Sequence, residues 1–402
     1  MARILSFVMC QEVKHKESYL FLLPWSLESV GGVNQVVENL FRQMKLDGKY
    51  DPMIMVNSWD DVKIRTKKIN GTDHSFFRLR SPWNSSRKLF NFLAFCVETI
   101  GRTWKFSKFI KSNKIVVINV HYCSLFALSI SLMKWVKIFK GKLVLSFHGA
   151  DLMAAKESHG VKKMLWKILV SSADKIITCS ESLRGELVKF EEACAGKTIT
   201  VHNGVDTSKF CSYEGFQTDS QLVNKRFILN VATLEHKKGQ DVLLRAFKIV
   251  VEKFEDVFLV IVGRPGGAEG QIRRLIKSFG LSQRVRLYEG LPHEEVSTLM
   301  KKATIFVLPS RYEPFGIVTL EAGAFGVPVI ASNVGGIREV LTHDKTGRLC
   351  EPDDVDALAL ELCHLLNNPE ERNRLGENLR KHVIENFSWN RSYQKYLDCI
   401  GL

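Results

Sequence analysis

Short apolar segments alternate with longer segments of helical periodicity along most of the chain. The apolar segments are rich in Val, Ile and Phe, and a helical stretch separates most of them from the next. Because neighbouring parallel strands need a crossover connection, usually a helix, this alternation predicts an α/β fold with parallel sheets. We expect strands at 4–9, 52–56, 115–121, 143–147, 175–179, 199–203, 227–232, 257–262, 285–288, 305–308 and 328–331.

The helical segments divide the chain into two separate α/β cycles. We expect helices at 33–44, 87–111, 161–172, 241–253, 294–302, 320–325 and 370–384. A polar stretch at 206–225 without clear periodicity lies between the cycles, which is typical of a linker between domains. The sequence therefore predicts two Rossmann-like domains, 1–205 and 206–385, that face each other across a cleft, and a closing segment at 386–402.

Several classes of protein are excluded by what the chain lacks. No segment approaches the ~18 consecutive apolar residues of a membrane-spanning helix, and residues 1–10 lack the apolar core and cleavage site of a signal peptide. The nine cysteines are irregularly spaced and form no Cys-x-x-Cys pair, which favours buried thiols in a reducing compartment. We therefore expect a cytoplasmic protein.

The densest chemical signal runs from Pro309 to Glu321, directly after the predicted strand at 305–308. A strand, a loop with Pro and Gly and then a helix start expose backbone N–H groups to an anion such as a diphosphate. Carboxylates are poor phosphate ligands but good acceptors for sugar hydroxyls, so Glu313 and Glu321 suggest a sugar beside the phosphate.

Further glycine-rich turns follow other predicted strands or, in the case of Gly31-Gly32, open a predicted helix. They are Gly31-Gly32, His148-Gly149, Lys238-Gly239, Gly263-Arg264 and Gly335-Gly336. The carboxyl ends of the strands are where an α/β sheet binds its ligand. No turn spells the Gly-x-Gly-x-x-Gly fingerprint or a Walker loop, so NAD binding and ATP hydrolysis fit poorly.

These motifs, in this order, resemble glycosyltransferase family 4, whose members are retaining enzymes of the GT-B fold that use a nucleotide-sugar donor. The resemblance covers nearly the whole chain. The residues that carry it are Gly31-Gly32, His148 to Asp151, Cys179-Ser180, His202 to Asp206, Lys238-Gly239, Val262-Gly263, Glu313 to Glu321, Gly335-Gly336 with Glu339, and Phe387 to Trp389.

The resemblance implies a role for each matching position. His148 would lie beside the transferring sugar and Glu313 would bind its hydroxyls, as the catalytic pair, and the segment at 386–402 would cross back to the first domain. The implied donor-binding residues are Gly32, Thr233, Lys238, Arg264, Leu291, Phe315, Gly316, Ile317 and Glu321, with Glu321 on the ribose and Lys238 and the Phe315 to Ile317 backbone on the diphosphate.

Two features bear on how the diphosphate would be held. The family usually has an arginine where this chain has Thr233, so either Lys237 or Arg264 supplies that charge or the charge of the leaving diphosphate is balanced more weakly. The motifs contain no Asp-x-Asp pair suited to holding Mg²⁺ on a diphosphate, so we expect a metal-independent reaction with a UDP-, GDP- or ADP-sugar as substrate and no other cofactor.

The charge distribution points to the acceptor. Lys and Arg outnumber Asp and Glu by 57 to 43, and residues 1–200 hold the whole excess. The segments 87–111, with Phe90, Leu93, Val97, Ile100 and Trp104 at helical spacing, and 125–140 mix apolar and basic residues, which favours contact with an anionic membrane. Ordinary helices with lysines in water explain the pattern equally well.

The expected acceptor is a membrane-associated glycolipid, lipopolysaccharide or polysaccharide precursor, and the expected location is the cytoplasm, peripherally on the inner face of the membrane. Two alternatives remain open. An epimerase-like enzyme of the same fold would use the same donor, and a nucleic-acid-binding protein would use the basic region, although no nucleic-acid-binding motif supports it and no such partner is expected.

Overall fold

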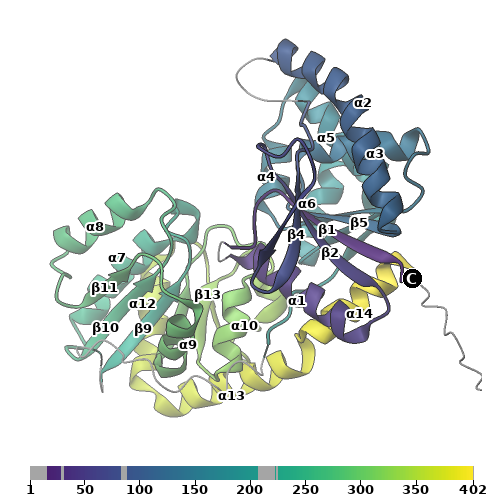
Figure 1. The fold of residues 1–402 in the computed structure, drawn as a ribbon. Coiled ribbons are helices and arrows are strands. Elements are labelled where there is room, and N and C mark those ends of the chain that lie inside the picture. The colour runs from purple at the N-terminus through teal and green to yellow at the C-terminus, as the bar shows by residue number, and fades with distance from the viewer. Residues whose placement is uncertain (1–15, 29–30, 83–87, 207–221, 223–224, 402) are drawn as a thin grey trace, which may run out of the picture.

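The computed structural model describes residues 16–28, 31–82, 88–206, 222 and 225–401, with the side chains of 88–97, 99 and 100 outside the description. Two lobes, each built on a largely parallel sheet, lie side by side (Figure 1). The α/β class and the GT-B type of architecture predicted from the sequence are confirmed. The predicted boundary at 205 and 206 adjoins residues 207–221, which lie outside the description.

The first lobe holds a sheet in which β3 and β4 are antiparallel and every other neighbouring pair is parallel. Its strand order is β3 (Arg65–Ile69), β4 (Thr72–Phe77), β2 (Asp51–Asn57), β1 (Ser18–Leu23), β5 (Ile115–His121), β6 (Lys142–Phe147), β7 (Lys175–Thr178) and β8 (Thr198–Thr200). Its helices are α1 (Gly32–Asp47), α2 (Lys88–Ser112), η1 (Leu125–Ala127), α3 (Leu128–Trp135), α4 (Ala150–Lys156), α5 (Gly160–Ser172), α6 (Glu181–Phe190) and η2 (Glu192–Lys197).

The second lobe holds a parallel sheet with its carboxyl ends turned toward the first lobe. Its strand order is β11 (Val285–Tyr288), β10 (Val257–Val262), β9 (Arg226–Val231), β12 (Ile305–Leu308), β13 (Val329–Ser332) and β14 (Arg348–Cys350). Its helices are η5 (His236–Lys238), α7 (Gln240–Val251), α8 (Glu269–Ser278), α9 (His293–Lys302), α10 (Ile317–Ala324), α11 (Ile337–Val340), α12 (Val355–Asn367) and α13 (Pro369–Asn386).

The last helix, α14 (Trp389–Ile400), leaves the second lobe and packs on α1 of the first (Figure 1). Its buried side chains Trp389, Tyr393 and Ile400 share one apolar cluster with Tyr19 of β1 and Leu40 of α1. The hydroxyl of Tyr393 also donates to Asp47 at 2.8 Å. The two lobes are therefore joined twice, by the chain that follows β8 and by the return of α14.

The predicted strands agree with the structure at most positions. The predicted first strand, 4–9, lies outside the described residues, whereas β1 was not predicted at all. All six β1 side chains are buried, because helices cover both faces of a parallel sheet. β8 ends at Thr200, earlier than predicted, and α10 begins at Ile317, three residues earlier than predicted.

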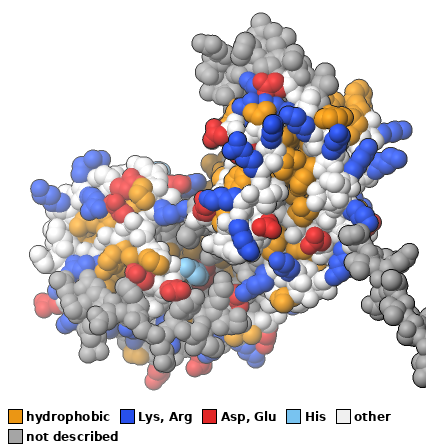
Figure 2. All heavy atoms as spheres, in the orientation of Figure 1, with side chains coloured by type: hydrophobic (Ala, Val, Ile, Leu, Met, Phe, Trp, Pro, Cys, Tyr) orange, Lys and Arg blue, Asp and Glu red, His pale blue; other side chains and the backbone are white. Residues whose placement is uncertain are grey.

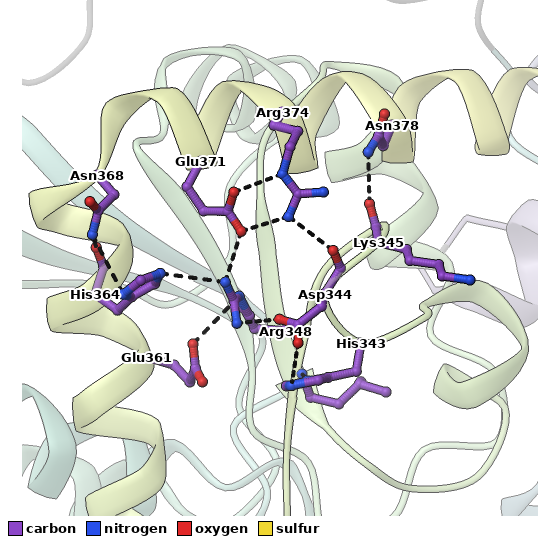
Figure 3. A network of polar contacts seen from close by, with 11 residues as sticks. His343, Asp344, Lys345, Arg348, Glu361, His364, Asn368, Glu371, Arg374 and Asn378 are labelled. Carbon is purple, nitrogen blue, oxygen red and sulfur yellow. Dashed lines mark hydrogen bonds and ion pairs between the residues drawn. The ribbon is translucent and has the colours of Figure 1, made fainter.

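A cluster of ion pairs ties β14 to α12 and α13 at the far edge of the second sheet (Figure 3). The Arg348 guanidinium is largely buried and pairs with Asp344 and with Glu371, the latter at 2.8 Å. Arg374 lies one turn after Glu371 in α13 and makes two hydrogen bonds of 2.7 Å to it. The strand β14 is thus held to α13 by charged side chains as well as by the apolar core.

The described cysteines, Cys123, Cys179, Cys194, Cys350, Cys363 and Cys399, are all buried and unpaired. This agrees with the prediction of buried thiols for these six residues. Within the described part of the chain, no helix combines the length and the apolar character that crossing a membrane requires.

Candidate functional site

A cavity of about 620 Å³ lies between the lobes, at the carboxyl ends of the strands of both sheets. Loops after β1 and β6 border it from the first lobe, and loops after β9, β10, β11 and β12 border it from the second. Every residue predicted for the site lines it: Gly32, His148, Thr233, Lys238, Arg264, Leu291, Glu313, Phe315, Gly316, Ile317 and Glu321. The fold therefore brings together in space what the sequence distributes over roughly 290 positions.

The loop between β12 and α10 forms one wall of the cavity. Gly316 has a φ of 88°, in the left-handed region that favours glycine, and α10 begins at the next residue without a side-chain cap. The first N–H groups of the helix, next to the cavity, are therefore suited to an anion. Gly335 supports the loop from below, because a Cβ there would overlap the backbone oxygen of Glu313.

Lys238 and Glu313 form an ion pair on the cavity wall. Lys238 Nζ donates to Glu313 Oε2 at 2.7 Å, and the hydroxyl of Ser310 lies 3.4 Å from the same oxygen. Both side chains are mostly buried. Arg311 fixes the relative position of their two loops, because it makes a double hydrogen bond of 2.8 Å to Asp241 at the start of α7. A cation and a carboxylate are thus presented side by side by two neighbouring loops.

Glu321 lies one turn into α10 and reaches the first lobe. Its Oε1 accepts a hydrogen bond of 3.1 Å from the side-chain amide of Gln35, on the first turn of α1. Glu313 and Glu321 therefore line one cavity from different heights, and Glu321 lies where the lobes meet. Sequence reasoning did not find Gln35, because nothing in the local sequence indicates a contact with a residue 286 positions away.

Glu339, in α11, forms a second contact between the lobes. Its carboxylate accepts from the backbone N–H groups of Glu181 and Ser182, at the start of α6, and lies 2.7 Å from His202 Nε2. Burial raises the pKa of Glu339, but these hydrogen bonds outweigh it and lower that pKa overall. Glu339 and His202 thus connect the lobes and do not line the cavity, although Cys179 and Asn203 of the same motifs do line it.

His148 is held by a chain of hydrogen bonds that starts from buried residues of β5. The side-chain oxygen of Asn119 accepts from the Ser146 hydroxyl at 2.9 Å, which fixes the orientation of the amide. The NH₂ group of Asn119 then donates to His121 Nε2 at 3.0 Å. The Nδ1–H of His121 then donates to His148 Nε2 at 3.1 Å, which leaves a proton on Nδ1 of His148. Burial lowers the pKa of His148 to about 4, so its ring is neutral at pH 7.

Asp151 has a structural role beside His148. Its two oxygens accept from the backbone N–H groups of His148, Gly149, Leu152 and Cys123 at 2.8 to 3.1 Å. Burial raises the pKa of Asp151 to about 6, against the opposing effect of these bonds. Because both oxygens are occupied, this carboxylate is poorly placed to attack a sugar, and it fixes the turn that carries His148.

Comparison with known proteins identifies the family. The family model described as Glycosyltransferase Family 4 matches residues 30–209, and the model described as Glycosyl transferases group 1 matches residues 216–382. The chain belongs to glycosyltransferase family 4.

Curated relatives of this glycosyltransferase include proteins that share 27% to 37% of aligned residues. An uncharacterized glycosyltransferase of Methanocaldococcus jannaschii is 27% identical over 372 residues, which cover 90% of this chain and 92% of the relative. The N-acetyl-alpha-D-glucosaminyl L-malate synthase of Bacillus anthracis is 29% identical over 73% of this chain and 76% of its own. Glycogen synthase of Mycobacterium tuberculosis is 29% identical over 58% of this chain, but the match spans only 55% of its own length.

Solved structures share the fold over nearly the whole chain. Sucrose-phosphate synthase of Thermosynechococcus elongatus has a TM-score of 0.73 at 22% identity and covers 95% of this chain and 98% of its own. Anabaena HepE in complex with UDP-glucose has a TM-score of 0.74 at 17% identity, with 96% and 100% covered. These likenesses show the GT-B fold of the glycosyltransferase and nothing finer.

Thr233 is where this glycosyltransferase departs from the family pattern, and the structure distinguishes the two possible substitutes. Lys237 pairs with Glu235 at 2.6 Å and does not line the cavity. Arg264 lines the cavity beside Thr233, and its guanidinium would lie 3.2 Å from a Cβ at Gly31 of the first lobe. Of the two, Arg264 is the cation that faces the same space as Lys238.

His121 and Asn119 are residues beside the site that sequence reasoning missed. Both lie in β5, and His121 is the last residue of that strand. The signal was present, because the strand was predicted with this end and a polar residue at the carboxyl end of a parallel strand faces the ligand side. The same rule singles out His148 and, one strand earlier, would have singled out His121.

Proposed function

We propose that the chain transfers a sugar from a nucleotide-sugar donor to a hydroxyl of a glycolipid, lipopolysaccharide or polysaccharide precursor, with retention of configuration at the sugar. The observation that carries the proposal is the convergence of Lys238, Glu313, Glu321 and the start of α10 on one cavity between the lobes. At about 620 Å³ the cavity has a size typical of small-ligand sites. Family membership and relatives named as glycosyltransferases support the reaction class.

In this proposal the second lobe binds the donor. The N–H groups at the start of α10, together with Lys238 and Arg264, hold the diphosphate, because dipoles and cations fixed in place stabilise the charge that develops there. Glu313 accepts from hydroxyls of the transferred sugar, and Glu321 accepts from the ribose. UDP, GDP and ADP are all compatible with these contacts, and the UDP-glucose complex of Anabaena HepE favours UDP.

Transfer then proceeds on one face of the sugar. The bond from the anomeric carbon to the diphosphate breaks as the acceptor oxygen bonds to that carbon from the same side, and the acceptor proton passes to the departing phosphate. The sugar passes through a positively charged, oxocarbenium-like state. His148 lies beside it with the Nδ1–H as a hydrogen-bond donor, and because the ring is neutral it adds no charge that would repel this state. Because the Asp151 oxygens are occupied by backbone N–H groups, no carboxylate nucleophile is assigned. The proposal includes no metal and no further cofactor.

The first lobe binds the acceptor in this proposal, on the inner face of the cytoplasmic membrane. The charge distribution supports this part of the proposal. Residues 62–150 contain 17 basic residues and two acidic ones, Asp73 and Glu98. Such a lobe attracts anionic lipids and polyanionic glycans.

A transfer assay with extracted lipid acceptors and a panel of UDP-, GDP- and ADP-sugars, read by mass spectrometry, tests the proposal. Lys238→Ala and Glu313→Ala are expected to lower turnover at least about 100-fold, since each removes a group that stabilises the transition state. Lys237→Ala, one position away and outside the cavity, is the matched control and keeps normal turnover. Normal turnover in Lys238→Ala and Glu313→Ala would overturn the proposal, and conversion of the donor sugar without any acceptor would favour an epimerase.

A further inference from the structure

A second, larger cavity opens on the first lobe, away from the cleft. It has a volume of about 1510 Å³ and lies between the second half of α2 and the segment from the end of α3 to the start of β6. We call it the α2–α3 groove. Its walls are mainly apolar, and the side chains that form them include Trp104, Ile110, Leu132, Val136, Ile138 and Phe139.

The rim of the α2–α3 groove exposes apolar side chains that a globular protein normally buries. Of the lining residues, Trp104 is 59% exposed, and Val136 and Ile138 are 46% and 43% exposed. Trp135, at the end of α3 and next to Val136 in the chain, is 81% exposed. Lys137, between these last two, has a φ of 59°, a strained conformation for a residue other than glycine. Large exposed apolar patches of this kind mark surfaces that meet another molecule or a membrane.

The same rim carries unpaired positive charge. Lys111, Lys114, Lys137 and Lys140 line the groove, are exposed, and form no ion pair with any residue that the structure describes. Among the lining residues only Glu17 is acidic. Figure 2 shows hydrophobic and basic side chains intermixed over the lobe that carries α2 and α3. The groove therefore complements a ligand with an apolar body and a negatively charged head.

The groove lies at the opposite end of the sheet from the cleft. Ile115 and Lys142, the first residues of β5 and β6, line the groove, whereas His121 at the end of β5 and His148 after β6 belong to the cleft side. The seven residues of β5 separate the two by roughly 20 Å at ~3.3 Å per residue. A molecule in the groove is therefore too far from the cavity between the lobes to take part in transfer.

We propose that the α2–α3 groove docks the protein on anionic phospholipids of a bilayer. An acyl chain lies against the apolar wall, Trp104 and Trp135 lie at the depth of the headgroups, and the four lysines meet lipid phosphates. The groove anchors the protein and does not present the acceptor, which enters the cleft separately. The inference deepens the proposed function and rests on it for the link to a membrane acceptor, but docking itself needs neither donor nor acceptor.

Co-sedimentation with phosphatidylglycerol vesicles, against phosphatidylcholine vesicles, tests the proposal on the full chain. The wild type is expected to bind the anionic vesicles and to bind more weakly at high salt. One variant reverses the charge of the four groove lysines. Its matched control reverses the charge of four exposed lysines of the second lobe, so that the net charge changes by the same amount. The two sets are K111E, K114E, K137E and K140E, and K253E, K277E, K301E and K381E.

The groove variant is expected to lose more than about 100-fold in vesicle affinity, while the control variant loses far less. Equal losses would show attraction by net charge alone and would overturn the proposal. So would absence of wild-type binding, or equal binding to phosphatidylcholine. Both variants should keep the wild-type melting temperature and the thermal shift caused by UDP, GDP or ADP, which reports separately on the donor site.

Quenching by brominated acyl chains locates the contact. Wild-type tryptophan fluorescence is expected to fall on brominated anionic vesicles, and the double variant Trp104→Phe and Trp135→Phe is expected to lose most of that decrease. Unchanged quenching in the double variant would place the membrane contact elsewhere and overturn the assignment to the groove.

Discussion

At His148 burial decides the charge of the ring that faces the cleft. Because its pKa is lowered to about 4, the ring is expected to stay neutral from pH 8 down to about pH 5 and to gain a proton only near pH 4. Titration of isotope-labelled histidines by NMR, with His148→Gln to assign the signal, measures this directly. A midpoint near the ordinary 6.5 would show that the ring is not buried in solution.

Arg264 should carry the charge that the family arginine supplies elsewhere. Arg264→Ala is expected to weaken binding of the preferred nucleoside diphosphate about tenfold or more, because a charge-assisted hydrogen bond to phosphate is lost. Lys237→Ala is the matched control and should bind normally, since Lys237 pairs with Glu235 outside the cavity. Isothermal titration calorimetry on both variants tests this, and the reverse order of effects would assign the charge to Lys237.

At the scale of residues, sequence reasoning located the wall of the cavity but not what holds it. Glycines, His148 and the two glutamates follow predicted strands, so topology alone brings them to one edge. Their supports are long-range contacts, such as Gln35 with Glu321, which arise only when the two lobes are packed together. The same holds for His121, whose ring matters because β6 lies beside β5.

At the scale of elements, the ion pairs of β14 and α13 make stability depend on pH (Figure 3). Hydrogen bonds from Arg374, and further from Arg348, lower the pKa of Glu371 to about 2. A lowered carboxyl pKa stabilises the fold above the unfolded value of 4.5, and this contribution is lost as the pH falls toward 2.

Glu371→Gln is therefore expected to lower the free energy of unfolding at pH 7, because it removes the ionised carboxylate. The expected loss is only about 1 kcal/mol, because water screens this partly exposed group. The difference from the wild type should shrink as the pH falls below about 4. Urea unfolding at a series of pH values measures both effects. A difference that stays constant down to about pH 2 would mean that the ionised carboxylate is not what stabilises the contact.

Element boundaries were predictable where one strand coincides with one apolar run. β5, β10, β11 and β12 have the predicted ends because polar or turn residues flank each run. β3 was missed because its exposed edge position leaves it polar, and its sequence Arg-Thr-Lys-Lys-Ile has no apolar run to detect. β4 lies between β3 and β2, and it was missed because its first four residues, Thr-Asp-His-Ser, are polar. β1 is apolar but was missed, because the apolar segment 4–9 comes earlier in the chain and matches the pattern of a first strand.

At the scale of the whole molecule, α14 closes the chain over the first lobe. Trp389 is buried beside the chain that follows β8, where a Cβ at Gly204 would overlap the backbone nitrogen of Trp389. Trp389→Ala is expected to lower the free energy of unfolding by about 3 kcal/mol, as for other large buried aromatic residues. Leu360→Ala, at a side chain that is 69% exposed, is the control and should change little. Equal, small effects in urea unfolding would show that α14 does not pack on the first lobe in solution.

The proposed nucleotide-sugar site belongs to the molecule as a whole, because both lobes contribute to it and Glu321 lies where they meet. Calorimetric titration with UDP-, GDP- and ADP-sugars tests this site without knowledge of the acceptor. We expect one nucleotide class to bind with one site per chain, and Glu321→Gln to weaken this binding about tenfold or more by removing the charged acceptor of the ribose hydroxyls. Absence of binding by every donor, or equal affinity in the wild type and Glu321→Gln, would refute a shared site of this kind.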